Sequence, residues 1–403
     1  MSTYLEERIK WYDDNYRAGN SLITDKQFDQ LERNLLSISL LIIYIPLFKY
    51  YVELNNNKGH SFMTADWLIN YNYGFINRGL IGTLFINITN NPEILLDIIS
   101  IVLISIYALI FYFLNKIFLS TKQNFISIIL IFSPASFLFP IYDSQGAFRK
   151  EILGILALLI LGAYSKTNDK KFLYWSALIY TVAIFSHTVN FFFLTTIFFI
   201  LFKIKNSRKI KDYLLFVIPT ILYISLYFMY SSTESELYEM RDSMCLELRE
   251  LGLFNLCGHG SFDFIVWDLN AAYLITQNIV INERRQEYYF YILLFFISLI
   301  PYFFDKKFLM NAPILILIGL SFIPLFLLAF DWGRWIYIMS VCFLVVYLLS
   351  DKTKSKNIIK YLLIAYPFLF RIEHCCDPIF IFNYEYFLNN LNYLGQNFLN
   401  IIN

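Results

Sequence analysis

Long apolar blocks recur along this sequence, and they constrain its fold more than any other feature. A helix that crosses a bilayer needs about 20 mainly apolar residues, and blocks of that kind recur from residue 35 to residue 371. Charged residues make up only 16% of the chain, against about 25% in soluble domains. A water-soluble fold could not bury these blocks, so we predict an all-α, polytopic membrane helix bundle with about 10–12 transmembrane helices.

Short polar or basic segments separate the predicted spans. The stretch 172–202 lies between two basic segments and predicts a tight hairpin of two short helices. A single tilted span is the alternative, and it would reverse the sidedness of everything that follows. The predicted spans are Leu35–Tyr51, Leu95–Leu119, Phe125–Ile141, Ala147–Tyr164, Phe172–Phe185, Asn190–Phe202, Tyr213–Tyr230, Tyr288–Phe304, Ala312–Phe330, Trp335–Leu349 and Tyr361–Phe370.

The distribution of basic residues predicts the orientation of the bundle. Short cytoplasmic loops carry an excess of Lys and Arg. If the N-terminus is cytoplasmic, most of the 32 Lys and Arg residues fall in internal segments. The C-terminus then lies outside. The net charge is only +1 and no solvated basic domain is present, so nucleic acid is not an expected partner.

The spans divide the chain into three regions. Residues 1–34 are charged and lack the apolar core of a signal peptide, so we predict a cytoplasmic helical hairpin there. The transmembrane bundle covers 35–371 and carries a first outer loop at about 52–94 and one large outer loop at about 231–287. Residues 372–403 form an outer tail. Because both long loops lie outside, we expect the functional site on the outer face.

The first outer loop contains Asp66 and the motif Gly-Phe-Ile-Asn-Arg-Gly-Leu at Gly74–Leu80. Its glycines allow close approach of the backbone, and Arg78 lies among aromatic and apolar residues. This pattern predicts a re-entrant or amphipathic segment that holds Arg78 against a buried anion. The alternative is an interfacial anchor, because Trp, Tyr and Arg are common at the level of the lipid headgroups.

A second charged motif, Arg149-Lys150-Glu151, lies at the start of a predicted span, just after the candidate acid Asp143. If the helix begins near Gly146, both cations lie in its first turn, where they oppose the helix dipole. Cations beside free backbone N–H groups would bind a phosphate well. The alternative is a polar cap on a membrane helix.

A third motif, Asp331-Trp332-Gly333-Arg334-Trp335, lies at the outer junction of two spans. Asp331 precedes Arg334 by three residues and can fix the guanidinium in one geometry, and that planar group suits phosphate oxygens. The two Trp residues are also typical of an aromatic belt, which is the alternative interpretation.

Further candidates are isolated polar residues of the outer segments. His187 lies at the tip of the predicted hairpin and suits proton transfer or sugar binding, although such a residue is often only a hydrogen-bonded plug. Arg284 and Arg285 precede a span, and Cys245 and Cys257 are disulfide candidates if the loop is in an oxidising compartment.

The sequence lacks the motifs of several common enzyme and transporter classes. The adjacent cysteines that follow His374 make a poor zinc site, so no metal is predicted. Paired CxxC, HExxH, Walker A, GxSxG and GxGxxG motifs do not occur. Nucleotide-driven transport and the common hydrolases are therefore disfavoured, and no cofactor is expected.

With its Gly74–Leu80, Arg149–Glu151 and Asp331–Trp335 motifs, its outward arginines and its architecture, the chain resembles bacterial polysaccharide-cluster membrane proteins, especially the O-antigen polymerase family. The best-known members have paired Arg-rich outer loops, whereas this chain has one large loop. The resemblance implies a multi-pass protein of the bacterial inner membrane. It also implies polymerisation of polyprenyl-diphosphate-linked repeat units on the periplasmic face, with membrane lipids and a chain-length regulator as partners.

The resemblance also implies roles for the charged residues. A sugar hydroxyl of one lipid-linked unit attacks the anomeric carbon of the growing chain, and polyprenyl diphosphate leaves. The diphosphate is neutralised mainly by Arg78, Arg149, Lys150 and Arg334, with Arg284 and Arg285 in support. Asp331 contributes to the same binding site by orienting Arg334. The proton acceptor is one of Asp66, Asp143, Glu151 and His187.

Other functions stay open. A GT-C glycosyltransferase, which uses a polyprenyl-monophosphate sugar, keeps its catalytic acid in the first outer loop, where Asp66 lies. A flippase or other transporter would place charged residues within the spans, whereas here they cluster at the outer ends. A structural scaffold would leave the arginines without a role.

Overall fold

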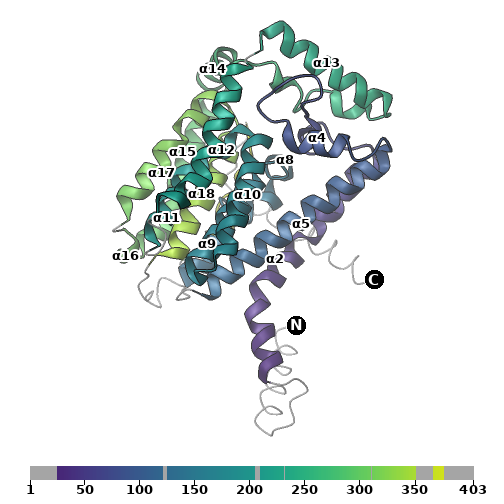
Figure 1. Cartoon of the computed structure of the whole chain (residues 1–403). Helices are drawn as coiled ribbons and strands as arrows, with labels where there is room; N and C mark the ends of the chain where they lie inside the picture. The colour runs from purple at the N-terminus through teal and green to yellow at the C-terminus, as the bar shows by residue number, and fades with distance from the viewer. Residues whose placement is uncertain are drawn as a thin grey trace.

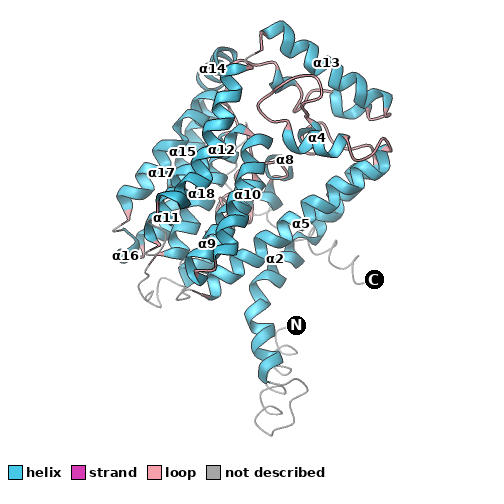
Figure 2. Ribbon diagram, viewed as in Figure 1, coloured by secondary structure: helices cyan, strands magenta, loops and turns pink. Residues whose placement is uncertain are grey.

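The computed structural model describes residues 25–120, 125–204, 209–230, 232–309, 311–350 and 366–375. Within these ranges the chain forms helices joined by turns and loops (Figure 2). In the first half the helices are α2 Asp25–Asn56, α3 Ala65–Leu68, α4 Leu80–Ile86, α5 Pro92–Leu119, α6 Phe125–Ile131, α7 Phe139–Tyr142, α8 Ser144–Ala147, α9 Ile152–Thr167, α10 Lys170–Ser186, η1 Thr188–Phe193 and α11 Leu194–Lys203. In the second half they are α12 Ile210–Met229, α13 Glu234–Glu250, η2 Phe254–Cys257, η3 Asp263–Ile265, α14 Leu269–Gln277, η4 Asn278–Glu283, α15 Arg285–Phe303, α16 Lys306–Leu309, α17 Ala312–Leu328, α18 Trp332–Leu349 and η5 Tyr366–Phe368.

Four helical segments of the described ranges are long and apolar enough to cross a membrane: Leu35–Asn56, Pro92–Leu119, Ile210–Met229 and Trp332–Leu349. Three shorter apolar segments accompany them: Ile152–Thr167, Thr188–Lys203 and Ala312–Leu328. The helical membrane protein expected from the apolar blocks is therefore confirmed. The larger number of spans, about 10–12, stays a prediction.

The bundle is built around α9 and α18, which are apolar on all faces. Such a helix is stable when other helices cover it on every side. Within α18, 89% of the residues of the candidate span are buried, against 22% in α12 at the periphery. The helix α9 packs against α5, α10, α11 and α18.

Two predicted spans differ from the structure at their boundaries. The expected helix Phe125–Ile141 ends at Ile131 and is followed by turns, because Pro134 and Pro140 have no N–H group to continue a helix. The expected helix Ala147–Tyr164 begins only at Ile152. The turn before it carries the second charged motif, so Arg149 and Lys150 precede the helix and do not lie in its first turn.

The N-terminal hairpin falls mainly outside the described residues. Where the description begins, at Asp25, the chain is already in α2, which continues without a break to Asn56. Residues 25–34 are therefore the start of the first long helix rather than part of a separate hairpin. Of the last predicted span, only Tyr366–Phe370 is described, and it forms a short 3-10 turn followed by a bend.

The predicted hairpin at 172–202 is confirmed, and the single tilted span is wrong. The tip residue His187 lies against Glu151, just before α9 begins. At the far end of α11, Lys203 lines the same pocket as Ser165 and Asn168, where α9 ends. The chain therefore returns to the end of the bundle from which α10 began.

Both long loops lie at the same end of the bundle. Ser261 N–H donates to Ser61 O (2.9 Å), and Ser61 Oγ donates to His259 O (2.9 Å), so the first loop pairs directly with the large one. Figure 1 shows α4, α8, α13 and α14 gathered at this end, opposite α16. We call it the loop end of the bundle.

Candidate active site

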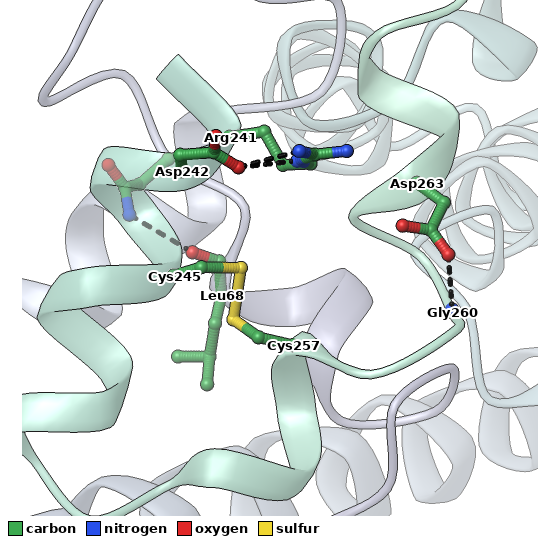
Figure 3. Close-up of a disulfide and its surroundings, with 8 residues drawn as sticks. Leu68, Arg241, Asp242, Cys245, Cys257, Gly260 and Asp263 are labelled. Atoms are coloured by element: carbon green, nitrogen blue, oxygen red, sulfur yellow. Dashed lines mark hydrogen bonds and ion pairs between the residues drawn. A yellow bond between two sulfur atoms is a disulfide. The ribbon is translucent and has the colours of Figure 1, made fainter. Parts of the chain in front are cut away.

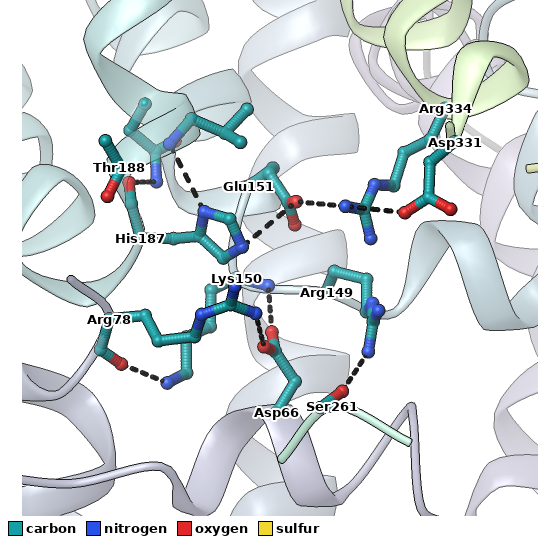
Figure 4. Close-up of polar contacts among 12 residues, drawn as sticks. Asp66, Arg78, Arg149, Lys150, Glu151, His187, Thr188, Ser261, Asp331 and Arg334 are labelled. Atoms are coloured by element: carbon teal, nitrogen blue, oxygen red, sulfur yellow. Dashed lines mark hydrogen bonds and ion pairs between the residues drawn. The ribbon is translucent and has the colours of Figure 1, made fainter. Parts of the chain in front are cut away.

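Charged residues from four distant parts of the chain meet at the loop end of the bundle (Figure 4). Asp66 is on α3, His187 lies between α10 and η1, and Asp331 and Arg334 begin α18. The other members are Arg78, in the loop before α4, and Arg149, Lys150 and Glu151, in the turn before α9. We call these eight residues the charged cluster.

The turn before α9 is held by bonds to its backbone carbonyls. Tyr107 Oη donates to Ala147 O (3.0 Å), and Trp67 Nε1 donates to Phe148 O (3.0 Å). Both donors are fully buried aromatic residues. Because they satisfy carbonyls that no helix uses, the backbone can leave the helical path here and direct three consecutive charged side chains inward.

Asp66 is the carboxylate nearest the cations of the first and second motifs, and only 1% of it is exposed. Its Oδ2 accepts the Lys150 N–H (3.3 Å), and its Oδ1 lies 3.6 Å from Arg78 Nη1. Burial alone would raise the pKa of Asp66. The nearby positive charges, those of Arg149 and Lys150 above all, outweigh burial and lower this pKa below its usual range. Asp66 is therefore an ionised carboxylate at neutral pH and a weak base.

Lys150 is fully buried and joins the first outer loop to the turn before α9. Its Nζ donates to Arg78 O (2.7 Å) and Ile69 O (3.5 Å). Burial, more than any neighbouring charge, lowers the pKa of Lys150 to about 7. Its main contacts are thus with neutral carbonyls, and it positions the segment that carries Arg78.

Arg149 lies where the two long loops meet. Its Nη1 donates to Phe62 O (2.7 Å) and to Ser261 Oγ, and the guanidinium carbon lies 5.4 Å from the Phe62 ring centre. Its Nε is buried without a hydrogen-bond partner in the described part of the chain. Ser261 and the Phe62 carbonyl had no signal in the sequence, because neither belongs to a charged motif.

Glu151 stands between His187 and Arg334. Its Oε1 lies 3.6 Å from both His187 Nε2 and Arg334 Nη2, which is too long for a hydrogen bond. Neither carboxylate oxygen has a hydrogen-bond partner among the described residues, although only 3% of the residue is exposed. Burial raises the pKa of Glu151. A buried carboxyl group with a raised pKa and no hydrogen bond is well suited to accept a proton.

The tautomer of His187 follows from its backbone contact. Nδ1 accepts the Val189 N–H (3.2 Å), so the neutral ring carries its proton on Nε2, which faces Glu151. Burial, and next the charge of Arg78, lower the pKa of His187. His187 therefore presents its Nε2–H group toward Glu151.

Ligand atoms of Asp66, Glu151 and His187 all lie within 4.8 Å of one another, which is close enough to surround a metal ion. The surroundings oppose this. A neutral His that ligates through Nε2 must carry its proton on Nδ1, but Nδ1 here accepts a backbone N–H. Arg78 and Arg334 also lie 3.6 Å from two of the ligand oxygens. These residues fit an anion and a mobile proton better than a cation.

Arg334 is fixed at the start of α18 by its own motif. Its Nη2 lies 2.9 Å from Asp331 Oδ2, and its guanidinium carbon lies 4.3 Å from the Trp335 ring centre. Gly333 is essential to this arrangement, because a Cβ there would overlap the carbonyl of Glu373. The segment 371–375 therefore crosses the end of α18 at direct backbone contact, and Gly333 N–H donates to His374 O (3.0 Å).

Asp143 lies outside the charged cluster and binds the chain through both of its carboxylate oxygens. Its Oδ1 accepts the Gly146 N–H (2.9 Å) and caps α8. Its Oδ2 pairs with His374 Nδ1 (2.6 Å) and accepts the His374 N–H. That pairing lowers the pKa of Asp143 against the effect of its burial, and it raises the pKa of His374. Asp143 thus anchors the segment that supports Gly333.

A cavity of about 160 Å³ opens onto the charged cluster. The acidic and basic side chains that line it are Arg78, Arg149, His187, Asp268, Asp331 and Arg334. Aromatic rings of the large loop, Phe264 and Trp267, also line it, together with Trp335. A phosphate at the cations would therefore have aromatic faces beside it, and such faces suit sugar rings.

Arg284 and Arg285 are placed differently from the other predicted arginines. Arg285 Nε donates to Tyr289 Oη on the same helix (2.8 Å), and the side chain is exposed. Arg284 is half-buried and forms the boundary between η4 and α15. Neither residue lines the cavity at the charged cluster.

The predicted disulfide between Cys245 and Cys257 is present (Figure 3). Their Cα atoms are 5.6 Å apart, and the bond joins α13 to η2. Just beyond η2, the chain reaches Ser261, which contacts Arg149. The disulfide therefore braces the part of the large loop that touches the charged cluster.

Comparison with known proteins adds no relative. The chain matches no protein-family model, no curated protein and no solved structure.

Proposed function

We propose that this chain is a membrane glycosyltransferase that moves a glycan from a polyprenyl-phosphate lipid to a sugar hydroxyl. The first form of the proposal is a polymerase that joins polyprenyl-diphosphate-linked repeat units, as the resemblance to the O-antigen polymerase family implies. It places the protein in a bacterial inner membrane with a cytoplasmic N-terminus, and it places the charged cluster on the periplasmic side. The expected partners are the lipid-linked glycan, membrane lipids and a chain-length regulator.

One observation carries this proposal: four cations and two incompletely bonded carboxylates meet in one buried place at the end of an apolar helix bundle. The cations are Arg78, Arg149, Lys150 and Arg334. Preorganised charges in a site shielded from water stabilise a developing anion far better than charges in solution. Because these cations lie at the end of a membrane bundle, the anion that we propose for them is the phosphate of a lipid.

The chemistry requires a leaving group and a proton acceptor. The acceptor hydroxyl attacks the anomeric carbon of the donor sugar, the new C–O bond forms, and the bond to the lipid phosphate breaks with its electron pair on the phosphate. Arg334 and Arg78 stabilise the phosphate that leaves. Glu151 takes the hydroxyl proton, because burial raises its pKa, whereas the nearby cations lower the pKa of Asp66.

Asp66 supports a second candidate, a GT-C glycosyltransferase with a polyprenyl-monophosphate sugar as donor. That class keeps its catalytic acid in the first outer loop. Asp66 lies there, on a short helix, with one buried oxygen lacking a hydrogen bond within the described ranges. The two forms differ in the residue that accepts the proton. Asp66→Asn is expected to abolish a GT-C transferase and to impair a polymerase less than Glu151→Gln does.

The test is deletion of the gene followed by mass spectrometry of lipid-linked and surface glycans. Single complete repeat units on the lipid indicate a polymerase, and truncated units indicate a transferase that adds one sugar. Complementation with wild type, Glu151→Gln and Asp66→Asn then assigns the proton acceptor. Undisturbed surface and lipid-linked glycans would refute both forms, and repeat units confined to the cytoplasmic leaflet would indicate a flippase.

A further inference from the structure

A second cavity, about 490 Å³ in volume, lies between α15 and α17 with α18 as its floor. Ligand sites in proteins are commonly about 300–1,000 Å³. The floor consists of Ile336, Met339 and Phe343, which recur along one face of α18 and are at most 3% exposed. None of the described residues that line this groove is charged.

The rims of the groove face outward from the bundle. Phe296 on α15 is 59% exposed, and Ile316 on α17 is 61% exposed. Figure 1 shows α15 and α17 at the side of the bundle, away from α2 and α5. In a membrane, these rims would contact the hydrocarbon of the bilayer, so the groove is open to lipid along its length.

The groove and the cavity at the charged cluster both include residues at the start of α18. Trp332 lines the groove, and the neighbouring residues Asp331 and Arg334 line the cavity at the charged cluster. From Trp332 to Phe343 the helix rises about 16 Å at 1.5 Å per residue. That distance is close to half of the roughly 30 Å hydrocarbon core, or one leaflet.

We propose that this groove holds the polyprenyl chain of the lipid-linked donor, with its phosphate at Arg334 in the adjacent charged cluster. The inference rests on the proposed function for the identity of the lipid. The two cavities suit the two parts of such a lipid: the groove is apolar over about one leaflet, and the cavity lined by Arg334 lies at the same end of α18. Binding the tail would place the phosphate at the site and limit how the sugar can turn.

Gly319 of α17 offers a way to fill the groove without disturbing its walls. A Cβ at this position would lie 3.8 Å from Phe343 Cζ and 4.0 Å from Met339 Sδ, which are ordinary contacts. Gly319→Phe therefore places a ring in the groove. Leu317→Phe is the matched control, because Leu317 is on the same helix, is 59% exposed and does not line the groove.

The experiment uses the full chain, purified in lipid nanodiscs, and a polyprenyl phosphate that carries a photoreactive group in its chain. Binding of inorganic diphosphate is measured in parallel as a probe of the charged cluster alone. Gly319→Phe is expected to weaken labelling by the lipid at least about tenfold, equivalent to about 1.4 kcal/mol. Diphosphate binding should be unchanged, and Leu317→Phe should behave as wild type in both assays.

The possible outcomes separate this inference from the proposed function. Wild-type labelling of Gly319→Phe, or equal competition by an ordinary phospholipid, would overturn the inference, because the groove would then hold bulk lipid or a segment of this chain. Loss of labelling in Gly319→Phe, together with diphosphate binding that Arg334→Gln does not weaken, would support the groove and refute the proposed site. Failure of the tail assay alone would leave the charged cluster in place.

Discussion

Replacement of Arg334 tests the charged cluster at its most constrained residue. Arg334 is 6% exposed, and its Nη2 serves both Asp331 (2.9 Å) and Glu151 (3.6 Å). Arg334→Gln removes the cation and leaves two carboxylates without it. Breaking a buried ion pair in this way costs about 3–5 kcal/mol. Because the Asp331 side chain is 13% exposed, we expect a loss near the lower end of that range.

Arg334→Lys keeps the charge and loses the planar fork. We expect most of the stability to remain. If two of its N–H groups bind the leaving phosphate and the lysine ammonium replaces one of them, the loss of the other removes about 1.5–3 kcal/mol of charge-assisted hydrogen bonding. That corresponds to a fall in turnover of about 10- to 150-fold. Stability is measured by thermal unfolding in detergent, and turnover by release of the polyprenyl carrier.

The matched control is Arg241→Lys on α13. Arg241 pairs with the adjacent and mostly exposed Asp242, and such surface pairs contribute at most about 1 kcal/mol. We expect neither stability nor turnover to change. Full turnover of Arg334→Lys would refute the role of the guanidinium at the phosphate, and unchanged stability of Arg334→Gln would refute the buried ion pair.

Three further perturbations test the support of the site. Burial lowers the pKa of Lys150 to about 7 from its ordinary 10.5. Between these two pH values the unfolded chain binds more protons than the folded chain, so the free energy of unfolding should rise with pH. Lys150→Met should flatten that rise, as measured by thermal unfolding at several pH values. Cys245→Ser should lower the free energy of unfolding by about 2–4 kcal/mol, and reductant should bring wild type to the same value. Gly333→Ala should reduce turnover, because its Cβ meets the Glu373 carbonyl, whereas Gly258→Ala, with its nearest atom at 3.8 Å, should not.

Much of the helical architecture could be predicted because a single physical requirement dominates it. A bilayer demands continuous apolar helices, and the expected spans at 95–119, 213–230 and 312–330 nearly coincide with α5, α12 and α17. The main error is the third predicted span, 125–141. Its apolar composition indicates one continuous helix, but Pro134 and Pro140 interrupt it.

The site was less predictable, because its geometry depends on contacts between distant segments. The sequence motifs identified every member of the charged cluster, but they could not show that Lys150 donates to the carbonyl of Arg78 or that Arg149 contacts Ser261. The partnership of Asp143 with His374 was also missed. In the sequence, His374 stands out only beside the adjacent cysteines, and no local pattern relates it to a residue as distant as Asp143.

Direct turnover of a lipid-linked donor by the purified protein is the most direct test of the account. The protein in nanodiscs is supplied with a polyprenyl-diphosphate-linked repeat unit, and mass spectrometry follows the glycan and the lipid. We expect a longer glycan and one released polyprenyl diphosphate for each glycosidic bond formed. Both products should be lost in Glu151→Gln. Folded wild-type protein that releases no polyprenyl carrier from this donor or from a polyprenyl-monophosphate sugar would contradict the central claim.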